Sequence, residues 1–176
     1  MRVIGLAGWS GAGKTTLIVK LIPFLRERGF SVSTLKHAHH AFDVDQPGKD
    51  SYLHREAGAH EVLVASSRRF ALMHELRGAD EPSLADLLRR MSAADLILVE
   101  GFKRDAHAKI EVFRTANQKP FLYPEDTSIA ALATDAADGP PHHLPHAHLD
   151  DIEAIAGLIL ALARPIEETI SRIAKA

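Results

Sequence analysis

A glycine-rich segment near the start of the chain has the residue types and spacing of a phosphate-binding loop (P-loop). Residues Gly8–Thr15 read Gly-Trp-Ser-Gly-Ala-Gly-Lys-Thr and match G-x-x-x-x-G-K-[ST] at every defined position. Glycines let the backbone curl so that successive N–H groups face phosphate oxygens, and a following helix presents its own N–H groups to the same anion. The chain is therefore predicted to bind a nucleoside triphosphate, rather than to form a glycine-rich turn without a ligand.

Three further side chains are assigned roles around the phosphates. Lys14 is expected to reach the β- and γ-phosphates, and the Thr15 hydroxyl to ligate Mg²⁺. Glu100 follows the apolar run Leu96–Val99, so it is placed at the end of a buried strand. An acidic residue there holds Mg²⁺ or one of its waters in P-loop proteins, and the alternative is a carboxylate that faces solvent. One of Asp43, Asp45 and Asp50, which follow the second predicted strand, is expected to complete the metal shell. We choose Asp50, at the start of a predicted short helix, although a turn or a helix cap would select the same residue type.

The segment after the second predicted strand is rich in imidazole groups. His37, His39 and His40 would suit zinc, copper or nickel better than Mg²⁺, but adjacent residues of an extended chain point to opposite sides. Contact with phosphate or substrate is an equal alternative, and a solvated loop is the ordinary state for any one histidine. Lys49 and Lys103 add positive charge that would serve a second anionic substrate, or they are ordinary surface lysines.

No complete sequence motif identifies the group that recognises the base. The chain has no [NT]-K-x-D segment, the familiar guanine-reading motif. Asp135 would accept hydrogen bonds from guanine N1–H and the 2-amino group, although a short turn after a strand would give the same sequence. No glutamine or arginine is obviously placed to orient a hydrolytic water, so hydrolysis is expected to be slow.

Composition narrows the class of protein. The 176 residues are 46% hydrophobic and 25% charged, which is ordinary for one globular domain, predicted to span residues 1–176. A formal net charge of −2 argues against a nucleic-acid binder that depends on a basic surface. The absence of cysteine excludes disulfides, thiolate zinc sites and cysteine nucleophiles. No signal-peptide pattern or long apolar span is visible, so we expect no membrane partner and a cytoplasmic location.

A parallel sheet is needed to bring these side chains together. Residues 3–7 predict a buried strand, residues 16–28 a helix and residues 31–35 a second strand, which together make a β-α-β unit. Further strands are predicted at residues 96–99, 110–113 and 129–133, and further helices at residues 50–57, 83–91, 150–163 and 165–174. The predicted fold class is α/β, a three-layer P-loop NTPase fold with a mostly parallel sheet and flanking helices. Ligands bind at the carboxyl ends of such strands, so the P-loop, Lys36–His37, Glu100 and Asp135 are expected to share one edge.

Two segments fall outside this sheet. Residues 61–65 and 70–74 are apolar runs separated by Ser66–Arg69, and they predict a β-hairpin extension. Residues 138–148 form a connector rich in proline and histidine. We interpret it as a solvated loop rather than a metal-binding patch made of His142, His143, His146 and His148.

Four segments together resemble one family. They are the P-loop through Thr16, Lys36–His40, residues 47–59 and Leu98–Lys103. Over nearly the whole chain they are similar to the molybdopterin-guanine dinucleotide biosynthesis adaptor (MobB) family. The resemblance implies GTP and Mg²⁺ binding, weak GTPase activity and a homodimer. It also implies assistance to the guanylyltransferase that joins GMP to molybdopterin in molybdenum cofactor biosynthesis, and contact with molybdopterin and its loading machinery.

Carried onto this chain, the resemblance assigns the triphosphate to the loop and the start of its helix: Gly8, Ser10, Gly11, Ala12, Gly13, Lys14, Thr15 and Thr16. It makes the histidine loop with Lys49–Ser51 a nucleotide-responsive segment and places Glu100 and Lys103 at the active edge. Ala41 stands where the family often has aspartate, so no ligand role is expected there. A small-molecule kinase or ATP-dependent ligase, and a metallochaperone GTPase suggested by the 11 histidines, remain the alternatives.

Overall fold

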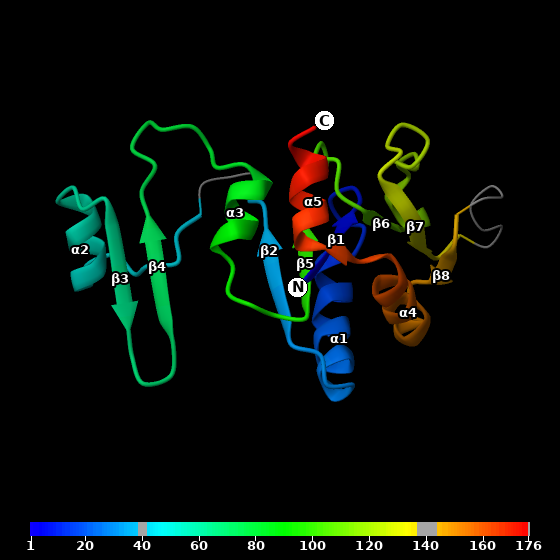
Figure 1. Cartoon of the computed structure of the whole chain (residues 1–176), viewed down its shortest axis with the longest axis horizontal. Coiled ribbons are helices and arrows are strands. Elements are labelled where there is room, and N and C mark those ends of the chain that lie inside the picture. The colour runs from blue at the N-terminus through cyan, green and yellow to red at the C-terminus, as the bar shows by residue number, and fades with distance from the viewer. Residues whose placement is uncertain (39–41, 137–143, 176) are drawn as a thin grey trace. The chain divides into compact units, whose positions relative to one another are not determined.

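The computed structural model describes residues 1–38, 42–136 and 144–175, and it divides into two compact units. The larger unit comprises Met1–His37 and Leu84–Ala176, and the smaller unit comprises Ala38–Ser83. The larger unit carries the P-loop and the smaller one carries the hairpin (Figure 1). That residues 1–176 form a single domain stays a prediction.

The larger unit is built on a central sheet. Its strands are β1 (Arg2–Ala7), β2 (Val32–Lys36), β5 (Leu96–Glu100), β6 (Lys109–Phe113), β7 (Ile129–Thr134), β8 (His146–His148) and β9 (Arg164–Pro165). In the described residues the sheet is seven-stranded, with the order β2-β5-β1-β6-β7-β8 and parallel pairing throughout that path. The short β9 pairs antiparallel with the start of β1. The predicted mostly parallel sheet is confirmed.

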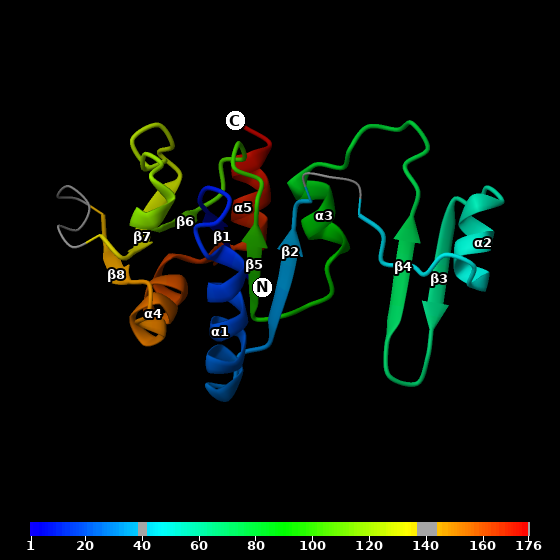
Figure 2. The same cartoon turned by 180° about the vertical axis from the view of Figure 1, so that it is seen from behind.

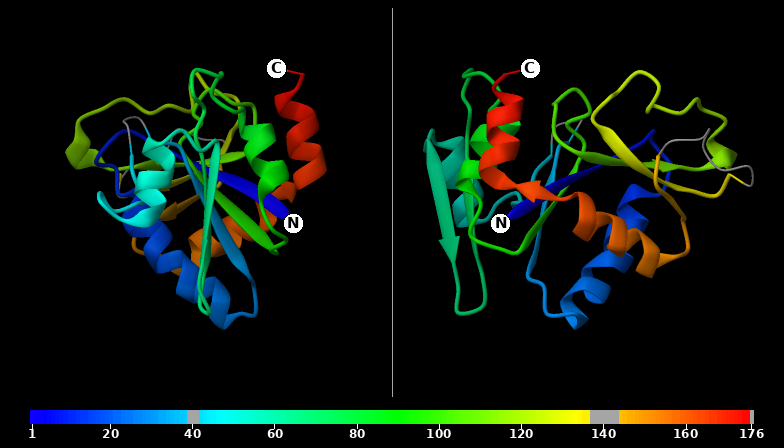
Figure 3. Two further views of the ribbon diagram at one scale, coloured as in Figure 1. Left: turned by 90° about the vertical axis from the view of Figure 1, so that its left-hand side faces the viewer. Right: turned by 45° about the vertical axis from the view of Figure 1, so that its right-hand side comes forward.

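Helices cover both faces of this sheet. One face carries α1 (Lys14–Glu27) and α4 (Ile152–Leu162), and the other carries α3 (Leu84–Arg90) and α5 (Ile166–Ile173) (Figure 2; Figure 3). Alternate residues of β1 supply the two cores, since Ile4 packs among the residues of α1 and α4 and Val3 among those of α3 and α5. The three-layer α/β architecture is therefore as predicted. None of the helices in the described ranges combines the length and the apolar composition needed to cross a bilayer.

One strand lies where a solvated loop was predicted. Within the connector, His146–His148 forms β8 and pairs in parallel with Leu132–Thr134 of β7. Ala147 is buried between two exposed histidines, so the strand has a single inward side chain and no visible apolar pattern. His142 and His143 lie outside the described residues.

The smaller unit consists of α2 (Asp50–Glu56) and the antiparallel hairpin of β3 (Glu61–Ala65) and β4 (Phe70–His74), which confirms the predicted hairpin. Its segments are joined by the guanidinium of Arg55. That group lies 2.8 Å from Asp43 Oδ2, 3.2 Å from Asp45 Oδ2 and 2.9 Å from Glu75 Oε1. A single side chain of α2 therefore holds both the segment before the helix and the residue that follows β4.

Candidate nucleotide-binding site

The P-loop joins the end of β1 to the start of α1, as its sequence predicts. Gly8 has φ 148°, and a methyl group placed on it would lie 2.4 Å from the carbonyl oxygen of Val112 in β6. Gly13, directly before the helix, has φ 95°, a left-handed conformation that favours glycine. The loop can therefore pass this close to β6 and turn into the helix only with glycine at these positions. Its curve ends at the N-terminus of a 14-residue helix, where unpaired N–H groups favour an anion.

Lys14 folds back over the loop. Its Nζ donates to the carbonyl oxygens of Gly8 at 2.9 Å and Trp9 at 3.0 Å. Burial lowers the pKa of Lys14, the nearby Glu100 carboxylate opposes this shift, and the charges of Lys103 and Lys36 reinforce it. The ammonium is thus held at the loop by neutral carbonyl groups, and phosphate oxygens would give it charged partners instead.

The two predicted magnesium residues of this unit come together. The Thr15 hydroxyl donates to Oε1 of Glu100 at 3.1 Å, and the Glu100 side chain is only 12% exposed. A hydroxyl and a carboxylate are the oxygen ligands that Mg²⁺ prefers, so the residues present fit this ion. Lys36, which follows Leu35 at the end of β2, places its Nζ 3.5 Å from the same carboxylate oxygen. Sequence reasoning had noted Lys36 only as part of a strand end, and its parallel register with Glu100 is what makes them neighbours.

The ends of β2 and β5 fit closely against each other. The backbone N–H of His37 donates to the Glu100 carbonyl at 2.9 Å, and the His37 ring lies 4.8 Å from the Phe102 ring. Gly101 has φ 97°, and a methyl group there would lie 2.7 Å from Cβ of His37. Farther along, Lys103 places its Nζ 5.1 Å from the centre of the Trp9 ring. The larger unit therefore brings His37 and Lys103 to the edge that carries Lys14, Thr15 and Glu100.

Other predicted residues lie in the smaller unit or outside the described residues. Lys49 and Asp50 lie in the smaller unit, where Lys49 precedes α2 and Asp50 is its first residue, and both are exposed. Their assignment to the site stays a prediction. His39 and His40 lie outside the described residues. In residues 1–38, 42–136 and 144–175, no group of three or more histidine, aspartate or glutamate side chains is arranged to hold a metal ion.

The carboxylate of Asp135 accepts hydrogen bonds from a neighbouring segment. Its Oδ1 accepts the Thr115 backbone N–H at 2.7 Å and the Thr115 hydroxyl at 3.0 Å. Burial favours protonation of Asp135, but the hydrogen bonds from Thr115 and the charge of Arg114 outweigh it and lower the pKa. Thr115 begins a short 3₁₀ helix, η1 (Thr115–Asn117), and the amide of Asn117 donates to the Ser10 carbonyl at 3.0 Å. Sequence reasoning missed this segment, and the polar run directly after β6 was the signal that could have found it.

A row of buried polar side chains supports the loops around the site. His107, Lys109 and Glu111 are each at most 1% exposed; His107 lies two residues before β6, and the other two lie within it. Lys109 Nζ donates to the Lys103 carbonyl and to Asp126 Oδ2, both at 2.8 Å. Glu111 accepts the backbone N–H groups of residues 122 and 123 at 2.7 and 3.0 Å, and burial raises its pKa. These contacts hold residue 103 and residues 122–126 against β6. Pro120, two residues before this segment, accepts the indole N–H of Trp9 at 2.8 Å.

Known proteins with similar sequences share one description. Residues 3–135 match the family described as molybdopterin guanine dinucleotide synthesis protein B (MobB). The molybdopterin-guanine dinucleotide biosynthesis adapter protein of Escherichia coli K12 is 46% identical over 163 residues, covering 90% of this chain and 91% of that protein. Its namesake in Haemophilus influenzae is 42% identical over 137 residues, covering 76% of this chain and 74% of that protein.

Solved structures agree in fold. A crystal structure of molybdopterin-guanine biosynthesis protein B is 28% identical with a TM-score of 0.70, covering 91% of this chain and 99% of the other. The Bacillus subtilis MobB structure is 23% identical with a TM-score of 0.70, covering 93% of this chain and 99% of the other.

Proposed function

Because this chain belongs to the MobB family and acts in molybdenum cofactor biosynthesis, we propose that it is a GTP-binding adapter with weak GTPase activity. It would assist the guanylyltransferase that makes the dinucleotide form of the cofactor. The observation that carries the proposal is the contact of the Thr15 hydroxyl with Glu100 at 3.1 Å, beside a P-loop that holds Lys14. That pair is a ready set of oxygen ligands next to a phosphate cradle.

The chain's own residues would divide the binding of Mg²⁺-GTP between them. The backbone N–H groups of the loop and Lys14 would hold the phosphates, with contributions from Ser10, Gly11, Ala12 and Thr16. Thr15 and Glu100 would hold Mg²⁺, which when bound neutralises charge between the phosphates. Lys14 would exchange its two carbonyl partners for phosphate oxygens. Asp50 would complete the metal shell, and Asp135 would accept from guanine.

The adapter role needs a segment that responds to the nucleotide. The end of β2 meets this need, since Lys36 lies 3.5 Å from the Glu100 carboxylate and the His37 N–H donates to the Glu100 carbonyl. A change at Glu100 would therefore act first on the residues that lead into the histidine loop and on to Lys49. Ordering of that loop by nucleotide is the proposed signal to the guanylyltransferase and to the molybdopterin-loading machinery. We further propose a cytoplasmic homodimer.

Titration calorimetry tests the nucleotide proposal directly. The wild-type protein with Mg²⁺ should bind GTP in preference to ATP. Lys14→Ala should weaken GTP binding about 10- to 100-fold, since a hydrogen bond to a charged group contributes about 1.5–3 kcal/mol. Lys20→Ala, an exposed lysine of the same helix, is the matched control and should leave affinity unchanged. Absence of binding of both triphosphates by folded wild-type protein would overturn the proposal, and tight binding of ATP alone would favour a kinase or ligase.

Reconstitution tests the adapter role. Dinucleotide formation by a molybdenum cofactor guanylyltransferase should increase when wild-type protein and GTP are added together. The Lys14→Ala protein should give no such increase, whereas Lys20→Ala should behave as wild type. Equal stimulation by all three proteins would show that nucleotide binding has no part in the adapter function.

A further inference from the structure

The Thr15–Glu100 contact indicates on which side of β1 the terminal phosphates of a nucleotide would lie. Glu100 and Lys36 come from β5 and β2, on one side of β1, while β6 and β7 lie on the other side. If Mg²⁺ is held at Thr15 and Glu100, the terminal phosphates would lie on the β5 side, because this ion would neutralise their charge from there. The nucleoside must then extend toward the ends of β6 and β7. This step rests on the proposed function.

The segment after β6 lies against the P-loop on that second side. A methyl group placed on Gly13 would be 3.3 Å from Nη2 of Arg114, so the guanidinium lies beside the start of α1. A methyl group on Gly11 would be 3.1 Å from Oδ1 of Asn117, whose amide nitrogen also donates to the Ser10 carbonyl. A cation and an amide thus flank the loop where the nucleoside would leave it.

Asp135 fixes this segment while leaving Arg114 loosely held. Both hydrogen bonds from Thr115 go to Oδ1, at the first residue of η1. Nη1 of Arg114 lies 3.7 Å from Oδ2, which is longer than a hydrogen bond, and the Arg114 side chain is 42% exposed. Two hydrogen bonds therefore hold the turn at Thr115, whereas the planar guanidinium of Arg114 can change partner.

We propose that Arg114 contacts the nucleoside of a purine triphosphate, packing its planar guanidinium against the base. Arginine stacks on aromatic faces through its delocalised plane, which lysine cannot reproduce. Asp135 is then first of all a positioning residue: one carboxylate oxygen holds the Thr115 turn on the loop, and only the other is left to accept from the base. Arg114 and Asn117 thereby extend the phosphate cradle into a nucleoside subsite.

Comparison of Mg²⁺-GTP with Mg²⁺-tripolyphosphate separates nucleoside from phosphate contacts. By calorimetry, Arg114→Ala should weaken GTP binding about tenfold and leave tripolyphosphate binding within about twofold of wild type. Arg114→Lys should lose most of the same affinity, because it keeps the charge without the plane. Lys14→Ala should weaken both ligands, and Arg104→Ala, an exposed arginine of the same unit, should change neither.

Asp135 provides a second readout. Asp135→Asn keeps an oxygen that accepts from Thr115 but replaces the other with a donor, so it should lose less GTP affinity than Asp135→Ala, which should lose at least as much as Arg114→Ala.

Each contrary result has a distinct meaning. Equal weakening of GTP and tripolyphosphate by Arg114→Ala would make Arg114 a phosphate-binding cation, and no weakening of either would remove it from the site. Both results overturn the inference and leave the proposed function standing. A wild-type protein that binds neither ligand would overturn both.

Discussion

His107 is the buried side chain whose polar atoms are least satisfied. It is 1% exposed, and within the part of the chain that the structure describes neither ring nitrogen has a hydrogen-bond partner. Burial and the charge of Lys109 lower the pKa of His107 to about 4. The nearby backbone of Asp105 and the charge of Asp126 oppose this shift, although the Asp105 backbone does not make a hydrogen bond with the ring. The ring is therefore neutral at pH 7 and fills space beside Gly5, where a methyl group would lie 2.3 Å from its Nε2.

The stability of the larger unit should fall in mild acid because of this ring. An unfolded histidine takes up its proton near pH 6.5, whereas folded His107 does so near 4, so between these values the unfolded chain binds more protons. The free energy of unfolding should drop by up to about 1.4 kcal/mol per pH unit as pH falls through this window. His107→Leu should remove that contribution and cost little at pH 7, since no hydrogen bond is lost.

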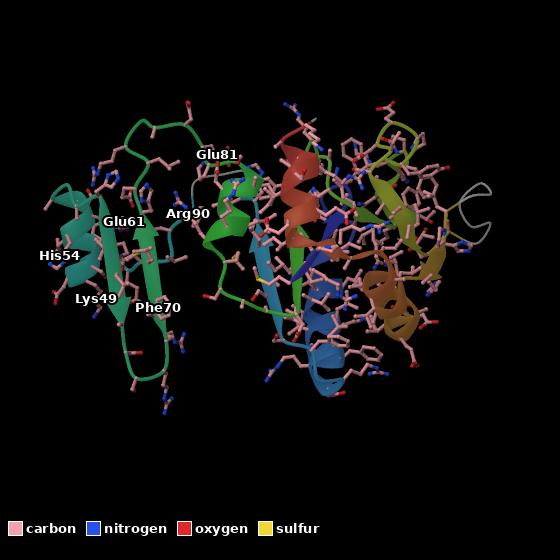
Figure 4. All side chains as sticks on the ribbon, viewed as in Figure 1. Lys49, His54, Glu61, Phe70, Glu81 and Arg90 are labelled. Atoms are coloured by element: carbon pink, nitrogen blue, oxygen red, sulfur yellow. The ribbon has the colours of Figure 1, made fainter. Side chains whose placement is uncertain are left out.

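Urea unfolding followed by the fluorescence of Trp9, the only tryptophan, measures this effect at pH 7 and pH 5. His54→Gln, which changes an exposed histidine of the smaller unit, is the control (Figure 4). The same pH dependence in wild type and His107→Leu would contradict the argument.

At the level of elements, β6 is a buried strand whose charged side chain Lys109 binds two loops. Lys109 is 1% exposed and its ammonium reaches both the Lys103 carbonyl and Asp126. Burial favours protonation of Asp126, but its hydrogen bonds with Lys109 and Ser128 outweigh this and lower the pKa. The strand therefore ties two loops of the candidate site to the sheet through one side chain.

A double-mutant cycle should reveal the energetic coupling between Lys109 and Asp126. Lys109→Met should destabilise the larger unit by about 1.5–3 kcal/mol, because it leaves the Asp126 carboxylate without its charged donor. Asp126→Asn alone should cost less, and the double variant should cost clearly less than the sum of the two single changes. Chemical denaturation of the four proteins gives the coupling energy. Additive effects would show that the pair contributes nothing beyond its separate contacts.

The elements that sequence predicted well carry their own local signals. The P-loop motif fixed the junction of β1 and α1, and the hairpin strands Glu61–Ala65 and Phe70–His74 were predicted with their observed bounds. In both cases the pattern depends on residues close together in the chain: glycine spacing in one, and apolar runs around a four-residue turn in the other.

The elements that sequence missed depend on distant partners. The two-residue strand β9 forms because it pairs with Arg2 and Val3, and no local sequence pattern predicts it. The burial of Lys109 and Glu111 within β6 has no local signal, because the groups that satisfy them lie in residues 122–126. Arg114 was missed since its importance arises from its approach to Gly13, about a hundred residues earlier.

At the scale of the whole molecule, the smaller unit presents an unusual apolar surface. Leu63 pairs with Leu72 and Ala65 with Phe70, so these side chains share one face of the hairpin. Leu63 is 60%, Phe70 70% and Leu72 53% exposed, and Figure 4 marks Phe70 at the turn end of β4. A two-stranded hairpin is marginal alone, and an exposed apolar face of this kind is typical of an interface. This surface supports the proposed homodimer.

Sedimentation or light scattering over a range of concentrations tests this proposal. Wild-type protein should be a dimer, and Leu72→Glu should shift it toward the monomer by placing a charge at the centre of the apolar face. Val19→Glu, which changes an apolar residue 64% exposed on α1, is the control and should stay dimeric. A monomeric wild type, or a Leu72→Glu protein that dimerises as tightly, would rule out this face.

The sheet partners of β1 bear on how the chain acquires its site during synthesis on a ribosome. The P-loop directly follows β1, yet β1 pairs with β5, β6 and β9, whose residues come some ninety to one hundred and sixty positions later in the chain. Gly8 approaches Val112, and the Thr115 turn needs Asp135. A nascent chain cannot form these contacts until residues 96–165 have emerged, so the proposed binding of GTP would begin only after their synthesis.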